Sequence, residues 1–363
     1  MNELGLFGFL VHPLTPDDIT KKYPRMMEMA PNLTTKVIKA PRSISLSETN
    51  IIKSPTGAQA KGWFIALPVL PEYFTNKKKK KAALRRVKRA CEKAARKGAK
   101  IIGLGAFTAI VGEKGRKVAK HMSTYKHSSA ITTGNTYTVV TAIEGTKKAS
   151  ELMGIDLKEA RLAVVGATGS IGKACCRMMM PEVGEMILVS RTPEKLQALA
   201  KELSSSGKVI FSTSFEEIKE ADVVISVSSA DSALLQPEHI KKGAVVCDVA
   251  RPRDASERIR KERDDVLVID GGIVKLPGEV NFNCDLGLPQ GLAEACIAET
   301  IILALEKRYE NYTIGDEISK EKIEEIQYLA EKHGFKLAGL RRQEILFSPE
   351  EIELIRKNAR KGC

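Results

Sequence analysis

Short apolar runs alternate with helix-like stretches between residues 158 and 305. The runs are rich in Val and Ile, and the stretches between them repeat apolar positions every three or four residues. This alternation predicts a parallel sheet with crossover helices. The expected strands lie at residues 162–165, 186–189, 209–212, 223–227, 245–249 and 266–269. Because they are apolar on both sides, we expect a doubly wound α/β sheet with helices on each face.

The chain on either side of this segment differs in composition and in its pattern of apolar positions. Residues 1–150 contain many prolines and short apolar runs at 37–38, 51–52 and 63–67, which predict a separate α/β substrate-binding domain. Two charged segments, 319–333 and 348–360, have helical spacing and open with serines suited to capping. We therefore expect domains over residues 1–150 and 151–305, followed over 306–363 by C-terminal helices that pack back on the N-terminal domain.

A glycine-rich turn follows the first expected strand of the sheet, with the sequence G-A-T-G-S-I-G at residues 166–172. Gly166 permits a tight turn, Gly169 lets the backbone approach a pyrophosphate, and Gly172 lets the next helix pack on the strand. The N–H groups of that helix N-terminus then face the phosphates. This pattern predicts a Rossmann-type dinucleotide-binding domain over residues 151–305. The residues expected to contact the cofactor are Gly166, Thr168, Gly169, Ser170, Ile171 and Gly172.

The residues at the end of the next strand indicate whether the cofactor is NAD or NADP. An acid there, about 20 residues after the glycine turn, would bind the ribose 2′-hydroxyl of NAD. This chain instead has Ser190, Arg191 and Thr192. A guanidinium and two hydroxyls suit a 2′-phosphate, because they form charge-assisted hydrogen bonds with its oxygens. The sequence therefore predicts NADP(H) as the cofactor.

The composition is that of an ordinary soluble globular protein. With 363 residues, 43% of them hydrophobic and 28% charged, the chain is neither collagen-like, wholly disordered nor a polytopic membrane protein. No apolar run approaches the roughly 20 residues that a spanning helix needs, and residues 4–11 lack the flanks of a signal peptide. The seven cysteines form no C-x-x-C pair, which argues against a disulfide framework or a metal site. We expect a cytoplasmic protein without a bound metal.

Most of the net charge of +13 comes from one segment. Residues 77–100 carry thirteen basic side chains and one acid, Glu92, which gives a local charge of +12. Their apolar positions recur with helical spacing, so we expect a helix with a narrow apolar stripe and a basic outer face. Such a face either only keeps the protein soluble or docks an acidic macromolecule.

Three kinds of acidic partner fit this basic face. They are an acidic carrier protein, an anionic membrane surface and nucleic acid. Nucleic acid fits least well, because no aromatic residue lies within residues 77–100 to stack on bases. For a carrier protein, we expect Lys79, Arg85 and Arg89 to contribute most to docking.

Most of the cysteines fit a structural role. Those on the expected apolar faces of helices and strands are small core residues, namely Cys91, Cys175, Cys176 and Cys247. Cys363 is the last residue of the chain. Cys284 and Cys296 remain as reactive candidates, since both follow the last expected strand of the sheet, near the edge where Rossmann ligands bind.

Spacing alone does not choose between Cys284 and Cys296. We expect a helix that opens near Pro289 and places Cys296 about two turns inside it, too deep for the full effect of the helix dipole. Glu294 and Glu299 nearby would raise the pKa of this thiol. A thiolate there would need stabilisation from elsewhere in the fold.

Five motifs in this order resemble those of the long-chain fatty acyl-[acyl-carrier-protein] reductases. They are G-L-G-A-F-T-A-I at residues 103–110, T-T-G-N-T at 132–136, V-V-G-A-T-G-S-I-G at 164–172, A-C-I-A-E at 295–299 and K-H-G-F at 332–335. The resemblance extends over residues 5–335. The glycine turn is common to many families, whereas the five motifs together are specific.

The resemblance implies a two-step reduction. A cysteine of the A-C-x-A-E helix, here Cys296, takes the acyl group from the carrier thioester, and hydride from NADPH then releases a fatty aldehyde. The loop at 132–136, with Thr133, Gly134 and Asn135, becomes the candidate for holding the substrate and its oxyanion. The implied partners are an acidic acyl carrier protein and an enzyme that consumes the aldehyde, together with a peripheral membrane contact.

Three other functions stay open. A shikimate-dehydrogenase-like reductase has an Asn-Thr-Asp motif that G-N-T at 134–136 resembles, but Tyr137 stands where the catalytic Asp would be. A glutamyl-tRNA-reductase-like enzyme would place its nucleophile ahead of the Rossmann domain, where Cys91 is the only thiol. The third alternative is a non-catalytic NADP-sensing adaptor that uses the basic helix to bind an acidic partner.

Overall fold

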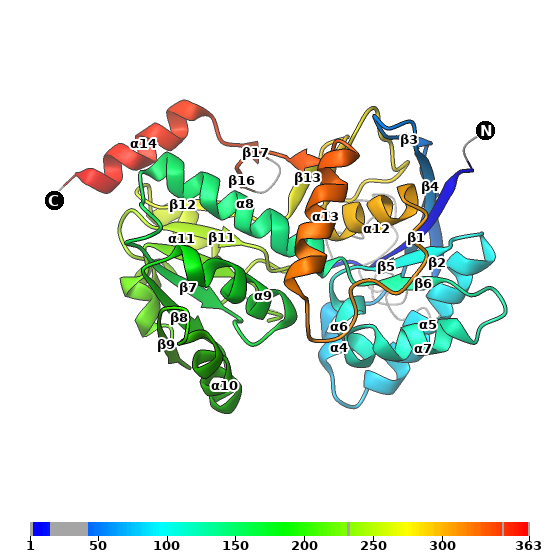
Figure 1. The fold of residues 1–363 in the computed structure, drawn as a ribbon, viewed down its shortest axis with the longest axis horizontal. Helices are drawn as coiled ribbons and strands as arrows, with labels where there is room; N and C mark the ends of the chain where they lie inside the picture. Colours follow the sequence, from blue (N-terminus) through cyan, green and yellow to red (C-terminus); the bar gives the residue numbers. More distant parts are fainter. Residues whose placement is uncertain (1–2, 15–42, 231–232, 343–344, 362–363) are drawn as a thin grey trace, which may run out of the picture. The chain divides into compact units, whose positions relative to one another are not determined.

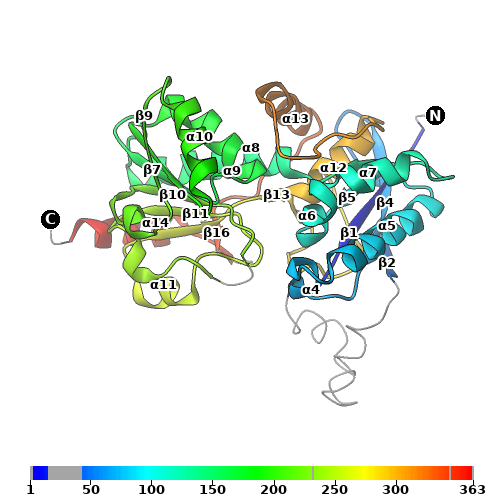
Figure 2. The same cartoon turned by 90° about the horizontal axis from the view of Figure 1, so that it is seen from below.

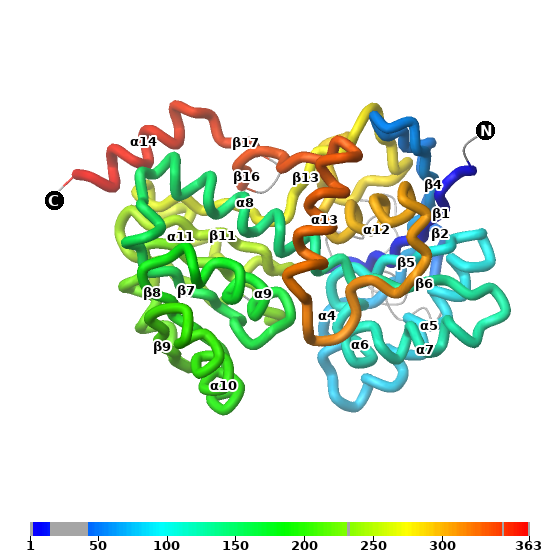
Figure 3. Tube along the Cα trace, viewed as in Figure 1, coloured from blue at the N-terminus to red at the C-terminus, as the bar shows by residue number. Residues whose placement is uncertain are grey.

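The computed structural model describes residues 3–14, 43–230, 233–342 and 345–361, which form two compact units (Figure 1). Unit 1 consists of the described residues of Met1–Asn135, Lys275–Asp316 and Ile326–Lys336. Unit 2 consists of those of Thr136–Val274, Glu317–Glu325 and Leu337–Cys363. Figure 3 follows the chain, which first changes unit at the start of helix α8 (Asn135–Met153) and later within helix α13 (Lys320–Lys332).

The sheet of unit 2 confirms the predicted doubly wound fold. Its strands run in the order β12 (Leu267–Asp270), β11 (Val245–Asp248), β10 (Val223–Ser226), β7 (Arg161–Val165), β8 (Glu185–Val189) and β9 (Lys208–Ser212). All neighbouring strands are parallel. Counted along the chain, this is the order 3-2-1-4-5-6 of a Rossmann domain, with the switch point between β7 and β10.

Helices and short strands complete unit 2. They are α8 from Thr136 onward, α9 (Ser170–Met179), η1 (Met180–Glu182), α10 (Pro193–Leu203), η2 (Glu216–Glu220), η3 (Pro237–His239), α11 (Glu257–Glu262), β16 (Arg341–Arg342), β17 (Ile345–Leu346) and α14 (Pro349–Arg360). The expected serine cap is present on α14, where Ser348 and Glu351 form a reciprocal capping box.

Unit 1 is built on a second, mixed sheet. Its strands run in the order β2 (Ile44–Glu48), β4 (Gln59–Ala66), β1 (Gly5–Val11), β5 (Ile101–Leu104) and β6 (Ala130–Thr132), and β3 (Ile52–Lys53) pairs with β4. Strands β4, β1, β5 and β6 are parallel, whereas β2 and β3 run antiparallel to β4. The strands expected at 51–52 and 63–67 correspond to β3 and β4, and residues 37–38 lie outside the described ranges.

Helices cover both faces of this sheet (Figure 2). The unit contains α4 (Pro71–Thr75), α5 (Lys80–Arg96), α6 (Phe107–Lys114), α7 (Arg116–Ser123) and α12 (Ala295–Leu305). Helix α5 packs on the face to which Gly8 points, because a Cβ on Gly8 would lie 2.8 Å from the Cβ of Ala94 on that helix. Gly5 points to the opposite face, because side chains alternate along a strand, and that face carries α12.

Glycines in the sheet let α12 approach its backbone. A Cβ on Gly5 would lie 2.1 Å from the carbonyl oxygen of Ala304, and one on Gly103 would lie 2.2 Å from Thr300 Oγ1. No side chain fits in either place. The helix itself is apolar nearly all round and has its side chains buried from Ile297 to Leu305. A helix of this composition must lie inside a core rather than on a surface.

The two units differ from the expected domains in two places. Helix α12 belongs to unit 1 rather than to the Rossmann domain, because it packs on β1, β4 and β5. Helix α14 belongs to unit 2 rather than to the N-terminal unit, and within unit 2 Asn358 Nδ2 donates to Asp264 Oδ2 at 3.1 Å. Short strands β13 (Ile273–Lys275) and β15 (Lys336–Leu337) span points where the chain changes unit, and β14 (Leu292–Glu294) pairs with β13.

Among the helices of the described residues, none combines the length and the apolar character needed to cross a membrane.

The close approach of α12 to the sheet at Gly103 leads to a stability prediction. Gly103→Ala should lower the free energy of unfolding by about 1–3 kcal/mol, because the new methyl group overpacks the contact with Thr300 and Phe9. Urea denaturation, followed by circular dichroism and by the fluorescence of the single tryptophan, Trp63, measures this loss. Gly145→Ala is the control, since its Cβ would meet only Ile269, at 3.5 Å. An unchanged midpoint for Gly103→Ala would contradict the close approach.

Candidate functional site

The glycine turn of unit 2 forms a cradle of backbone. Gly166 has a φ of +82°, and a Cβ there would lie 2.9 Å from the carbonyl oxygen of Val227. A Cβ on Gly172 would lie 2.3 Å from the carbonyl oxygen of Gly166. Gly169 is the N-cap of α9, so the first N–H groups of that helix open toward the turn. The turn therefore has the shape and polarity that a pyrophosphate needs.

The residues predicted to recognise the 2′-phosphate lie beside this cradle. Ser190 directly follows β8, and its Oγ lies 2.7 Å from Thr168 Oγ1 in the glycine turn. Arg191 is exposed at the strand end. Thr192 is the N-cap of α10 but does not cap it through its side chain. Two hydroxyl groups, one guanidinium and a helix N-terminus thus gather at the end of β8, where an NADP phosphate fits.

A buried aspartate that sequence reasoning missed fixes the neighbouring turn. Asp254 is fully buried and accepts hydrogen bonds from Ser226 Oγ at 2.6 Å, Ser228 Oγ at 2.6 Å and Ser228 N at 3.1 Å. These bonds hold the chain after β10, whose Val227 carbonyl faces Gly166. In the sequence Asp254 looks like any loop acid, because its partners lie 26 and 28 residues away.

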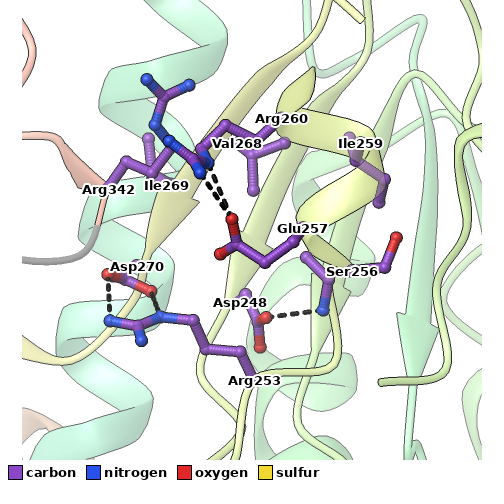
Figure 4. Close-up of a pocket in the computed structure, with 11 residues that line it drawn as sticks. Asp248, Arg253, Ser256, Glu257, Ile259, Arg260, Val268, Ile269, Asp270 and Arg342 are labelled. Atoms are coloured by element: carbon purple, nitrogen blue, oxygen red, sulfur yellow. Dashed lines mark hydrogen bonds and ion pairs between the residues drawn. The ribbon is translucent and has the colours of Figure 1, made fainter. Parts of the chain in front are cut away.

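The carboxyl ends of β11 and β12 carry a second polar cluster, which borders a pocket (Figure 4). Arg253 pairs with Asp270 through two hydrogen bonds of 2.7 and 2.9 Å. Asp248 accepts the N–H of Ala255 at 2.8 Å, and burial raises the pKa of this carboxyl to about 7. Ligands of Rossmann domains bind at this edge of the sheet.

Cys296 lies in the first turn of α12, which corrects the expected position two turns inside a helix. Helix α12 begins at Ala295, and the preceding residues, Leu292–Glu294, form the short strand β14. The thiol therefore lies close to the positive end of the helix dipole, which favours a thiolate. Burial raises the pKa of the Cys296 thiol above its usual range, and Glu294 and then Glu299 raise it further.

The loop predicted to hold the substrate contacts Cys296 directly. Gly134 has a φ of +75°, and a Cβ there would lie 2.3 Å from both Cα and Cβ of Cys296. Thr133 is 2% exposed, and its Oγ1 makes no hydrogen bond within the described residues. Asn135 opens helix α8. The loop that precedes α8 and the first turn of α12 thus meet at Gly134 and Cys296.

The other thiols have the environments that the sequence predicts for them. Those expected in the core are buried, namely Cys91, Cys175, Cys176 and Cys247, and burial raises the pKa of each. Cys284 is half-buried, like Cys296, and Cys363 lies outside the described residues. Among the described residues, no group of three or more His, Cys, Asp or Glu side chains could hold a metal ion.

The basic segment forms helix α5, as predicted. Its apolar side is buried at Ala83, Val87, Ala90 and Cys91. Lys79, at the N-cap, and Arg85 and Arg89, on the helix, are exposed. Helix α7 packs beside α5 and adds further exposed cations, Arg116, Lys117 and Lys120.

Comparison with known proteins gives one family model and several relatives. The model of the shikimate/quinate 5-dehydrogenase family matches residues 146–270, which lie in the Rossmann domain. The aminotransferase PigE of a Serratia species is 29% identical over 91% of this chain. The chain spans only 39% of the length of PigE.

Two further relatives are reductases. A glutamyl-tRNA reductase of Actinobacillus succinogenes is 27% identical over 44% of this chain and 39% of its own length. The long-chain acyl-[acyl-carrier-protein] reductase of Synechococcus elongatus is 30% identical over 80% of this chain and 86% of its own length. Together with the Rossmann sheet and the phosphate cradle, this similarity identifies an NADP(H)-dependent oxidoreductase. The chain belongs to the family of the long-chain acyl-[acyl-carrier-protein] reductase.

Proposed function

We propose that the protein reduces long-chain fatty acyl-[acyl-carrier-protein], or acyl-CoA, thioesters to fatty aldehydes through an acyl-enzyme on Cys296. The observation that carries the proposal is the setting of this thiol. It lies in the first turn of α12 and against Gly134, whose neighbour in the chain, Thr133, carries a hydroxyl that makes no hydrogen bond within the described residues. The activity named for the Synechococcus relative and the cofactor cradle of unit 2 support the same reaction.

The first step is an exchange of thioesters. Sγ of Cys296 loses its proton and attacks the acyl carbon, the bond to the carrier sulfur breaks, and the carrier leaves as a thiolate that takes up a proton to become a thiol. The exchange conserves an activated acyl group, because one thioester replaces another. The loop of Thr133, Gly134 and Asn135 holds the substrate in this proposal, and the hydroxyl of Thr133, which makes no hydrogen bond within the described residues, donates to the oxyanion that forms during the attack.

The second step is the reduction of this acyl group. NADPH, when bound at the glycine turn and Ser190–Thr192, supplies the hydride. Within unit 1, the loop at Gly134 shields Cys296 and keeps the acyl carbon oriented. Collapse of the reduced adduct then gives the aldehyde and regenerates the thiol of Cys296.

We further propose that an acidic acyl carrier protein docks on the exposed cations of α5. Lys79, Arg85 and Arg89 face solvent on a segment with a local charge of +12, so attraction to an acidic partner would speed association. Because the aldehyde is apolar, we propose that it passes to an aldehyde-consuming enzyme or to a membrane that the protein touches peripherally. The cytoplasm is the compartment that suits seven cysteines without a disulfide framework.

Replacing the nucleophile tests the mechanism. Cys296→Ala should abolish both the acyl adduct, seen by intact mass spectrometry without NADPH, and aldehyde formation, because covalent capture precedes reduction. The change should cost only about 1 kcal/mol of stability, and NADPH should still bind. Cys284→Ala, at the other half-buried thiol, should keep the adduct. Normal aldehyde formation by Cys296→Ala would overturn the covalent mechanism.

Arg191 tests the choice of cofactor. Arg191→Ala should raise the KM for NADPH about tenfold to a hundredfold, because a charge-assisted hydrogen bond to the 2′-phosphate contributes about 1.5–3 kcal/mol. Use of NADH should stay nearly unchanged, since NADH lacks that phosphate. Steady-state kinetics with both cofactors measure the difference. An equal rise in KM for NADPH and NADH would show that Arg191 does not recognise the 2′-phosphate.

Charge reversal tests the docking surface. Changing Lys79, Arg85 and Arg89 together to Glu should lower kcat/KM for acyl-carrier protein about tenfold or more at low salt, mainly through slower association. A short, neutral thioester substrate should be used as before.

The matched control for this variant reverses three exposed lysines of unit 2, Lys195, Lys201 and Lys261. It changes the net charge equally and should have little effect on use of the carrier substrate. If the α5 variant loses activity on both substrates alike, the helix is structural and does not dock the carrier.

A further inference from the structure

A buried carboxyl group lies one turn after Cys296 on α12. Glu299 is three residues further along the helix, on the same face, and has no exposed surface. Burying a carboxylate is costly unless hydrogen bonds compensate it. The proposed reaction gives this residue no part, so its position needs another reason.

Glu299 accepts hydrogen bonds from two threonines far away in the sequence. Thr132 Oγ1, at the end of β6, and Thr313 Oγ1 both donate to Glu299 Oε1, the latter at 2.9 Å. The two donor segments are also bonded to each other. The N–H of Thr313 donates to Thr132 Oγ1 at 3.2 Å, and the N–H of Thr133 donates to the Thr313 carbonyl at 2.9 Å. One carboxyl oxygen therefore joins α12, the end of β6 and the segment at Thr313.

This cluster controls the loop that contacts the thiol. Gly134 follows Thr132 by two residues, and its N–H lies 3.4 Å from Thr132 Oγ1. Gly134 in turn lies against Cα and Cβ of Cys296, and Thr133 carries the unused hydroxyl. Any shift of Thr132 away from α12 would move both residues away from Cys296.

We propose that Glu299 is a positioning residue, which fixes the loop from Thr132 to Gly134 against Cys296 so that the Thr133 hydroxyl is set for the acyl oxyanion. This inference rests on the proposed acyl transfer to Cys296. The carboxylate has a second effect, because its negative charge disfavours a thiolate one turn away. Glu294, the last residue of β14, acts on the thiol in the same direction.

The two effects can be separated by substitution. Glu299→Gln keeps the size of the side chain and an oxygen acceptor but removes the charge. Thr313→Val and Thr132→Val keep the charge but remove one donor each. Thr146→Val is the matched control, because it removes a fully buried helix hydroxyl, bonded to the Ala142 carbonyl at 2.7 Å, from unit 2.

The first measurement is the rate of acyl-enzyme formation with long-chain acyl-carrier protein, without NADPH. Thr313→Val and Thr132→Val should acylate about tenfold or more slowly than the wild type, whereas Thr146→Val should acylate at the wild-type rate. Wild-type rates for both loop variants would overturn the positioning role. Equal losses in all three variants would also overturn it, because the effect would then be a general cost of losing buried hydroxyls.

The second measurement is the alkylation of Cys296 by iodoacetamide between pH 7 and pH 10, followed by peptide mass spectrometry. Glu299→Gln should react about tenfold faster at a given pH below the titration midpoint, since the thiolate is no longer opposed by that charge. Thr313→Val should keep the wild-type profile. An unchanged profile for Glu299→Gln would overturn the electrostatic effect.

The two measurements distinguish this inference from the proposed function. Alkylation needs no acyl substrate, so it reports on Glu299 whatever the natural substrate is. A wild-type protein that forms no acyl adduct would refute the proposed function. Slow acylation confined to the loop variants, with normal thermal denaturation, would support the positioning role, and if Glu299→Gln fails to fold, the two threonine variants still test it.

Discussion

The close approach of α12 to the sheet of unit 1 is the constraint on which the site depends. An apolar helix can reach this depth only where the strands beneath it carry no side chain, as at Gly5 and Gly103. The contact at these two glycines fixes the position of α12 on the sheet, and therefore the position of Cys296 in its first turn. It also fixes Glu299 at the level of the loop after β6. Gly134 completes the arrangement, because only a residue without a Cβ can lie against Cys296 at a φ of +75°.

The Rossmann domain could be predicted from the sequence almost strand by strand. Its signals are local: each strand is a short apolar run, helices with their own period follow the first two strands, and the cofactor turn lies within seven residues, Gly166 to Gly172. The observed strands match the predicted ones within one or two residues at each end. The role of Asp254 cannot be predicted from the sequence, because its partners, Ser226 at the end of β10 and Ser228 just after it, lie far away in the chain.

Unit 1 was harder to predict, since it is assembled from segments far apart in the chain. The start of α12 was placed too early because Pro289 and the following apolar residues look like a first helical turn. In the structure Pro289 belongs instead to a turn closed by the N–H of Leu292, at 3.1 Å, and the N–H of Leu276 donates to the Gly291 carbonyl at 2.9 Å. These contacts hold the chain extended up to Glu294. No Ser, Thr, Asp or Asn marks the true helix start.

The electrostatics of Cys296 set its chemistry. A helix N-terminus favours a thiolate by about 0.3–2 kcal/mol, whereas burial and two nearby carboxylates act against it. Burial, Glu294 and Glu299 all raise the pKa of the thiol and so favour its neutral form. A neutral thiol resists oxidation, because the thiolate is the nucleophile that attacks oxidants. In the proposed acyl transfer, attack on the thioester would then be coupled to loss of the thiol proton, and a donor for the oxyanion, such as Thr133, would lower the barrier to that step without requiring a stable thiolate.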